Sequence, residues 1–180
     1  MVLETVVIAV WVMLPAYIPN NVAVVAGGGR PIDAGRNWHG ARLLGDGKTW
    51  RGTIVGTLAG FGVALVLNQV RPTAHEVAGY AFPHFTFAAA ISLAFGAMLG
   101  DILASFLKRR TGRERGASYP GVDQLDFVVV SLGLSAIVAT EWFFGTFTLP
   151  VLVAVFLITP VLHLSTNLIA YTLGLKNEPW

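Results

Sequence analysis

The sequence predicts an all-α, polytopic membrane protein with about five transmembrane helices. Hydrophobic residues make up 54% of its 180 residues and charged residues only 12%, and the mean hydropathy is +0.66, a composition typical of integral membrane proteins. The apolar residues gather in stretches of about 20, the length that crosses a hydrocarbon core of about 30 Å as a helix. Helices are expected because a lipid-exposed backbone must hydrogen-bond to itself. A chain of this length predicts one domain, residues 1–180.

Five stretches have the length and composition of a membrane span. The first carries Glu4, has no Lys or Arg ahead of it and shows no small-residue cleavage motif, so we interpret it as a retained span and not as a secretory signal. The five stretches cover residues 3–26, 53–70, 82–107, 125–144 and 149–173.

The basic residues predict the orientation of these spans. If the five spans alternate, the loops 27–52 and 108–121 share one side with the C-terminus, and the connections 71–81 and 145–147 share the other. Eleven of the twelve Lys and Arg residues then lie on the first side, and Arg71 alone lies on the second. This positive-inside bias predicts an outer N-terminus, a cytoplasmic C-terminus and two long loops that meet at the cytoplasmic face.

The composition also limits the chemistry. The chain has no cysteine, which excludes disulfides, thiolate catalysis and sulfur-bound metals, so any metal must bind oxygen or imidazole. A formal charge of +2 is too small for a general polyanion binder, and we expect no nucleic-acid partner.

The first long loop is rich in glycine, lacks apolar periodicity and is predicted to be irregular. It ends in GDGKTWRG, where glycines beside Lys48 and Thr49 precede a helix start and offer N–H groups and an ammonium to a phosphate. The alternative is a flexible loop whose basic residues touch anionic headgroups. A Walker loop is excluded, because Arg42 stands where its first glycine belongs.

The third span ends in a polar face. Helical rise places Asp101 roughly 28 Å from the start of the span, just inside the hydrocarbon edge, where a carboxylate usually faces the bundle interior and serves function. Asp101, Ser105 and Lys108 share one helix face by their four- and three-residue spacing. The alternative is a structural ion pair. Small residues upstream, Gly96 and Gly100, allow another backbone to approach.

Two further carboxylates begin the fourth span. Asp123 and Asp126 are three residues apart and point the same way on a helix. Acidic residues also suit a helix N-terminus, and Asp123 as an N-cap is the structural alternative. Together with Asp101 they place three carboxylates at one level, and such a cluster needs cations between its members. Hard oxygen donors favour Mg²⁺, with Mn²⁺ second.

The fifth span contains Pro160, followed by His163 and Asn167 on one face at four-residue spacing. Interhelical hydrogen bonding is the main interpretation of this pair. A polar notch for the headgroup of a lipid substrate is the alternative.

These residues resemble a known family. Asp101, SFLKR from Ser105, then Pro120, Gly121 and DQLD from Asp123 resemble the signature of the CTP:phosphatidate cytidylyltransferases, or CDP-diacylglycerol synthases. GKTWRG resembles an upstream KKTWEG segment of the same family, with Arg51 in place of Glu. The match covers about residues 45–127.

The departures from the signature indicate a branch of this family. Glu114 and Arg115 stand where the family has Lys-Asp, a His-Gly-Gly is absent, and the loop before the aspartates is short. The chain therefore looks more like the archaeal CDP-archaeol synthases. That resemblance implies a multi-pass cell-membrane enzyme that joins CTP to an isoprenoid ether lipid phosphate, 2,3-bis-O-(geranylgeranyl)glycerol 1-phosphate, with Mg²⁺, giving a CDP-lipid and pyrophosphate.

The roles of single residues follow from the motifs and the resemblance together. Asp101, Asp123 and Asp126 are assigned to one or two Mg²⁺ ions, and Lys108 is counted with them as catalytic. The nucleotide contacts are assigned to Lys48, Thr49, Arg51, Ser105, Lys108, Arg109 and Arg110. The headgroup role of His163 and Asn167 is the weakest assignment.

Two other functions fit parts of the sequence. A CDP-alcohol phosphotransferase also uses membrane aspartates and Mg²⁺, but its DGxxAR signature is missing here. A small transporter or lipid-binding scaffold would use the basic face only to hold headgroups, and its aspartates would be dispensable.

Overall fold

The computed structural model describes residues 2–112 and 121–174. This part of the chain contains six helices and one two-stranded hairpin, so the predicted all-α class is confirmed. Their bounds are α1 Val2–Ala26, β1 Asn37–Trp38, β2 Ala41–Arg42, α2 Trp50–Ala78, α3 Phe87–Arg110, α4 Val122–Val138, α5 Thr140–Thr146 and α6 Leu149–Thr172. Four of the helices, α1, α2, α3 and α6, are long and apolar enough to cross a membrane.

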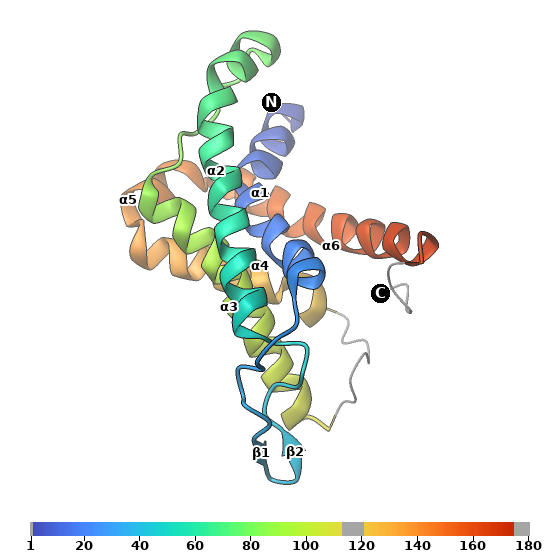
Figure 1. The fold of residues 1–180 in the computed structure, drawn as a ribbon. Helices are drawn as coiled ribbons and strands as arrows, with labels where there is room; N and C mark the ends of the chain where they lie inside the picture. The colour runs from blue at the N-terminus through green and yellow to red at the C-terminus, as the bar shows by residue number, and fades with distance from the viewer. Residues whose placement is uncertain (1, 113–120, 175–180) are drawn as a thin grey trace.

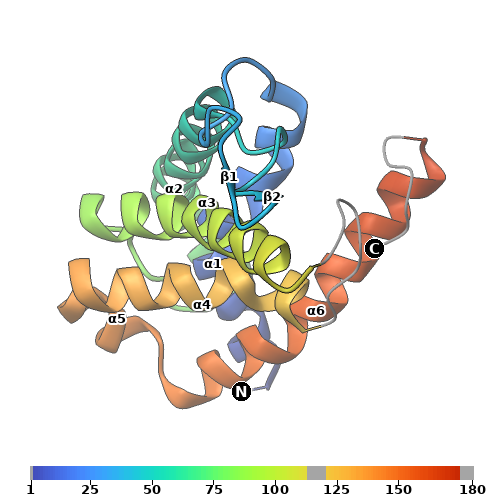
Figure 2. The same ribbon diagram turned by 90° about the horizontal axis from the view of Figure 1, so that it is seen from below.

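Five of the helices form a bundle from which the end of the sixth extends (Figure 1). Helix α1 packs on α2 and α3, and α3 packs along α4. Helix α6 packs its first half on α1 and α4 through residues such as Val151 and Val155, and its second half leads away from the bundle (Figure 2). Met13, Leu93 and Val128 are among the fully buried side chains of the core.

Glycines set the distance between the central helices. A Cβ built on Gly96 would lie 2.6 Å from the Cα of Ser131, and one on Gly100 would lie 2.6 Å from the Cα of Phe127. The two backbones therefore meet with no side chain between them, as small residues allow in membrane helices. The Ser131 hydroxyl, fully buried, donates to the Leu93 carbonyl at 3.0 Å across the same contact.

Glycines four residues apart hold α2 against α1 in the same way. A Cβ on Gly56 would lie 2.7 Å from the Pro19 carbonyl oxygen, and one on Gly60 would lie 2.3 Å from that of Pro15. Helix α2 thus begins close to the end of α1. The long loop between them folds at that end of the bundle (Figure 1).

The loop between α1 and α2 contains a small hairpin, where the sequence predicts only irregular structure. Asn37 pairs with Arg42 and Trp38 with Ala41 in antiparallel register. The two turn residues, His39 and Gly40, have φ of 49° and 78°, as two-residue turns that match the strand twist require. A pairing of two residues is too short for sequence alternation to show.

The predicted boundaries were wrong at two connections. Residues 71–81, expected to form a solvated connection, lie mostly in α2, which continues to Ala78 and ends at Gly79 with φ 70°. The third span begins at Phe87 and not at residue 82. Pro83 lacks an N–H, and the segment before α3 is held by Asn68, whose amide bonds the Phe85 N–H and carbonyl at 2.8 and 2.9 Å.

The single fourth span predicted over 125–144 is also wrong. The structure divides it into α4, of 17 residues, and α5, of 7 residues. The helix is interrupted at Ala139, whose φ of −126° and ψ of 47° are not helical. Trp142 on α5 then donates to the His84 carbonyl at 2.6 Å. Apolar residues on both sides keep the average hydropathy of this stretch high, although Thr140 and Glu141 directly follow Ala139.

The contact between α3 and α4 gives a stability prediction. We expect Gly96→Val to lower the free energy of unfolding by about 1–3 kcal/mol, because the added side chain meets the α4 backbone. Thermal unfolding of purified protein in detergent measures this. Gly133→Ala is the matched control, since nothing lies within 4 Å of a Cβ there, and it should be neutral or stabilising. An unchanged midpoint for Gly96→Val would contradict the tight contact.

Candidate active site

Lys48 is fixed at the start of α2. Thr49 is the N-cap of α2, and its side-chain oxygen accepts from the Gly52 N–H at 3.1 Å. A β-bridge joins Thr49 to Pro31, and the Lys48 carbonyl accepts from the Ile32 N–H at 2.9 Å. The sequence predicts the helix start here, but only the fold shows that a distant part of the loop holds it.

Lys48 reaches across to α3. Its ammonium lies 2.5 Å from Asp101 Oδ2, and both side chains are about three-quarters buried. The two residues are 53 positions apart in the chain. The first loop and the third helix therefore meet at a charged pair, which is the structural alternative stated for Asp101; the sequence assigned Lys48 to a phosphate and did not predict this partner.

A second pair of the same kind joins α3 to α4. The Lys108 ammonium lies 2.5 Å from Asp123 Oδ1, and the Asp123 side chain is 16% exposed. Gly121, not Asp123, is the N-cap of α4, and its N–H donates to Gln124 Oε1 at 2.5 Å. The N-cap alternative for Asp123 is thus wrong, and its carboxylate is directed to Lys108.

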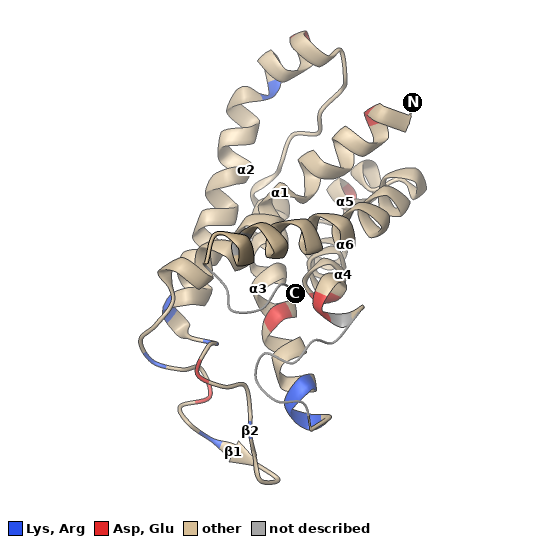
Figure 3. Cartoon of the chain, turned by 90° about the vertical axis from the view of Figure 1, so that its right-hand side faces the viewer, with Lys and Arg blue, Asp and Glu red and all other residues tan. Residues whose placement is uncertain are grey.

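Asp126 completes an acidic cluster with Asp101 and Asp123. Its carboxylate interacts electrostatically with both of them and with Lys48. The close approach at Gly100 causes this proximity, because a Cβ there would lie 2.7 Å from the Asp126 carbonyl oxygen. The acidic parts of α3 and α4 lie at one level, with the basic end of α3 next to them (Figure 3). Among the described residues, no ion pair involves Asp126.

The donor set of this cluster suits a hard cation. Its three carboxylates offer only oxygen, the ligand atom that Mg²⁺ prefers. As arranged here, Asp101 and Asp123 each hold a lysine. Within residues 2–112 and 121–174, no three His, Asp or Glu side chains are placed to share one ion. A cation shared by the three carboxylates thus requires their side chains to move from the positions seen here, in addition to the release of a lysine.

Asp33 organises the loop and was missed by the sequence analysis. Its side chain is fully buried and accepts from the N–H groups of Gly35, Leu44 and Gly45 at 3.0–3.1 Å. Arg42 donates to both of its oxygens, at 2.8 and 3.2 Å. The Arg42 guanidinium and these N–H groups hold the pKa of Asp33 well below its usual range. An aspartate among glycines was its only signal in the sequence.

The other residues assigned to nucleotide contacts lie on α2 or α3, and some of them contact the loop. Arg109 lies beside Gly45, where a Cβ would be 3.5 Å from Nη2. Ser105 is half-buried on α3, and Arg51 is exposed in the first turn of α2. Arg110 bonds the backbone of the hairpin.

Other residues named in the sequence predictions lie on α6 or outside the described residues. Asn167 and His163 share one face of α6, as their spacing predicts, and they hydrogen-bond to each other at 3.1 Å within this helix, where the main interpretation was hydrogen bonding between helices. Arg113, Arg115, Lys176 and Pro120 lie outside the described residues, as does most of the segment from Glu114 that departs from the family signature.

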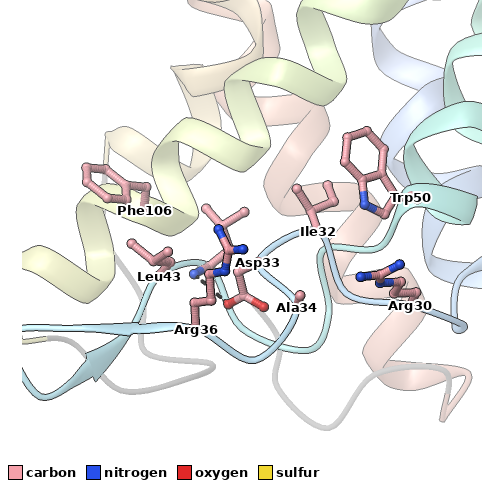
Figure 4. A pocket seen from close by; sticks show the side chains of 9 residues that line it. Arg30, Ile32, Asp33, Ala34, Arg36, Leu43, Trp50 and Phe106 are labelled. Atoms are coloured by element: carbon pink, nitrogen blue, oxygen red, sulfur yellow. Dashed lines mark hydrogen bonds between the residues drawn. The ribbon is translucent and has the colours of Figure 1, made fainter.

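A cavity of about 520 Å³ lies where the loop meets Trp50 of α2 and Phe106 of α3 (Figure 4). Its wall combines apolar side chains of the loop with Trp50 of α2 and Phe106 of α3. None of the clustered carboxylates lines it, so the cavity and the cluster are separate. The lining residues are Arg30, Ile32, Asp33, Ala34, Arg36, Leu43, Leu44, Trp50 and Phe106.

The whole described chain, and not only the charged motif, matches one protein family. The family model described as "CarS-like: CDP-archaeol synthase" matches residues 2–180. The chain belongs to the CDP-archaeol synthase family. This confirms the predicted family and branch, and favours a cytidylyltransferase over the phosphotransferase and the scaffold.

Relatives within the CDP-archaeol synthase family are similar along their full length. A CDP-archaeol synthase of Natronomonas pharaonis is 66% identical, with 100% of both chains covered. One of Halobacterium salinarum is 65% identical over 98% of this chain and 97% of its own. One of Methanospirillum hungatei is 48% identical over 93% and 100%.

A solved structure also shares the fold. It is that of an intramembrane enzyme for archaeal membrane lipids biosynthesis, with a TM-score of 0.71 and 38% identity, and the match covers 88% of this chain and 92% of that one. The CDP-archaeol synthase described here is thus a multi-pass membrane protein.

The Asp33 contacts predict how the loop responds to pH. Because folding lowers its pKa, Asp33 stabilises the loop at every pH above its ordinary value of about 3.9 and loses this contribution only as the pH falls through the lowered value. We expect Asp33→Asn to accelerate hydrogen exchange of the Leu44 and Gly45 amides between pH 7 and 4, where the unmodified loop stays protected. Asp46→Asn, which removes the exposed partner of Arg42, is the control. Equal exchange in all three proteins would contradict the role of Asp33.

Proposed function

We propose that this CDP-archaeol synthase transfers the cytidylyl group of CTP to the phosphate of 2,3-bis-O-(geranylgeranyl)glycerol 1-phosphate and releases pyrophosphate. The observation that carries the proposal is the convergence of Asp101, Asp123 and Asp126 with Lys48 and Lys108 where α3 meets α4. The product class is supported by the relatives, which are CDP-archaeol synthases. Both charge signs are required, because the reaction joins two anionic molecules.

The chemistry needs no protein nucleophile. An oxygen of the lipid phosphate attacks the α-phosphorus of CTP, the bond from that phosphorus to the bridging oxygen breaks, and pyrophosphate leaves with the electron pair. Such transfers are accelerated mainly by positioning and by neutralising charge on phosphate oxygens. The lysines and arginines at the ends of the first loop and of α3 supply both effects.

Two lysines are suited to leave their carboxylates for the nucleotide. Lys48 and Lys108 each sit on an aspartate, and a triphosphate offers each of them a stronger concentration of negative charge. Arg109, beside Gly45, extends this basic surface towards the loop. Thr49, Arg51 and Ser105 lie next to these residues in sequence or on α3 and are assigned secondary contacts.

The three carboxylates are proposed to hold Mg²⁺. Asp126 is the member best suited to begin this, since no ion pair involves it among the described residues. Asp101 and Asp123 become available as their lysines turn to phosphate oxygens. When bound, the ion would neutralise charge on the phosphates.

The site is proposed to face the cytoplasm, where CTP is available. The eleven basic residues on the side of the two long loops support this orientation. The N-terminus lies at the end of the bundle away from the hairpin (Figure 1), and α4 with α5 is counted as one crossing. Loops 27–52 and 108–122 then form the active site, and the His163–Asn167 pair remains a candidate headgroup contact.

The function is tested with purified protein, labelled CTP, Mg²⁺ and a panel of ether and ester lipid phosphates. We expect a CDP-lipid and pyrophosphate in equal amounts with the geranylgeranyl ether, and none when Mg²⁺ is removed by a chelator. The charge cluster is proposed to bind phosphates and not lipid tails. The ester analogues therefore measure the selectivity for the lipid tail separately. Absence of product with every lipid phosphate would overturn the proposed reaction.

A substitution of Asp126 tests the proposal that this residue is a metal ligand. Asp126→Asn should lower kcat/KM by about 100-fold or more while thermal unfolding stays within a few degrees, because the amide keeps the shape and removes the charge. Glu141→Gln on α5, outside the cluster, is the matched control and should retain activity. Normal turnover of Asp126→Asn would exclude Asp126 as a metal ligand.

A further inference from the structure

We propose that Arg110 is a positioning residue, which holds Lys48 in the active site by anchoring the β1–β2 hairpin to the end of α3. The inference rests on the proposed function for the role of Lys48, and it assigns Arg110 to the loop backbone and not to the triphosphate. A closed chain of contacts, which starts and ends on α3, supports this role.

The first link joins α3 to the hairpin. Arg110 Nη1 donates to the Trp38 carbonyl at 2.6 Å, and Nη2 donates to the carbonyls of Arg42 and Ala41 at 2.8 and 3.3 Å. The guanidinium lies 5.3 Å from the Trp38 ring and 5.5 Å from the Phe106 ring. It thus binds three carbonyls and lies beside two aromatic rings that stack on each other, a geometry that suits a planar guanidinium and not an ammonium.

The second link joins the hairpin to the loop interior. Arg42, whose carbonyl accepts from Arg110, directs its own guanidinium to Asp33. Asp33 in turn accepts from the N–H groups of Leu44 and Gly45. The backbone that Arg110 holds is therefore continuous with the backbone that Asp33 holds.

The third link returns to α3. The Gly45 carbonyl accepts from the Lys48 N–H at 3.3 Å, and the Lys48 ammonium reaches Asp101. Arg110 and Asp101 lie nine positions apart on one rigid helix, so the loop is fixed to α3 at two points. Without the contact between Arg110 and the hairpin, the position of Lys48 depends on the N-cap of α2 and on the Thr49–Pro31 bridge.

The occupied donors separate this role from direct phosphate binding. Hairpin carbonyls occupy Nη1 and Nη2 of Arg110, and Nε, which makes no hydrogen bond with the described residues, is buried. A phosphate that took over Nη1 or Nη2 would leave carbonyls without their donor. Lys48 and Lys108, in contrast, contact carboxylates that a cation can satisfy in their place.

The first experiment is a double-mutant cycle. Arg110→Ala should raise the KM for CTP about 10- to 100-fold with a smaller change in kcat, since it misplaces Lys48. Arg110→Lys should restore little. In a Lys48→Ala background, Arg110→Ala should add less than about twofold, because Lys48 is its route of action. Fully multiplicative effects of the two substitutions would show direct contact with the nucleotide and overturn the proposal.

The second experiment does not depend on activity. Hydrogen exchange over residues 37–48 should accelerate in Arg110→Ala and exchange in α4 should not. Arg71→Ala is the matched control, because Arg71 also donates to a carbonyl, that of Phe82, near the far end of α2. Unchanged exchange over residues 37–48 in Arg110→Ala would overturn the positioning role even if the proposed reaction holds. Accelerated exchange in a protein that makes no CDP-lipid would support the anchor while the proposed function fails.

Discussion

The direct backbone contact between α3 and α4 is the constraint on which the site depends. Gly96 and Gly100 remove the side chains that would separate the helices, so Asp101 on one helix and Asp126 on the other come to the same level. Carboxylates brought together in this way repel one another. The pairs Lys48–Asp101 and Lys108–Asp123 offset that repulsion. The packing that stabilises the bundle therefore also gathers carboxylates that need cations close to them. Enzymes that act on nucleoside triphosphates likewise need cations near the phosphates.

The loop between α1 and α2 holds Lys48 at the end of the bundle, although it contains only a short hairpin as regular secondary structure. Buried Asp33 acts as a centre that gathers backbone N–H groups and Arg42. Arg110 holds the outer edge from α3. Each of these charged groups is satisfied by backbone or by an opposite charge, as burial requires. A glycine-rich segment thereby obtains a defined shape.

The sequence was sufficient where the signal was local. Hydropathy predicted that the long apolar stretches form helices, and spacing predicted that Asp101 and Lys108 share one face of α3. The motif resemblance identified the family that the full-length relatives confirm. The sequence was insufficient where the outcome depended on contacts between distant residues. The break at Ala139 lies within a stretch whose average hydropathy stays high despite Thr140 and Glu141. The non-helical segment before α3 is held by Asn68, which lies 17 residues from its partner, and no local pattern reports such a bond.

The sequence by itself therefore determined an all-α membrane protein, its family and the residue types of the site. Composition and the apolar stretches predict the fold class, the resemblance of the motifs indicates the family and the candidate site residues, and neither needs the fold. Only the tertiary structure decided the partners: that Lys48 meets Asp101, that Asp123 meets Lys108 rather than capping α4, and that Arg110 binds the hairpin carbonyls. Several basic residues near several carboxylates allow many pairings in a sequence. One set forms because the glycine contacts and the hydrogen bonds of Asp33 fix the backbone, and each side chain reaches only the partners within its length.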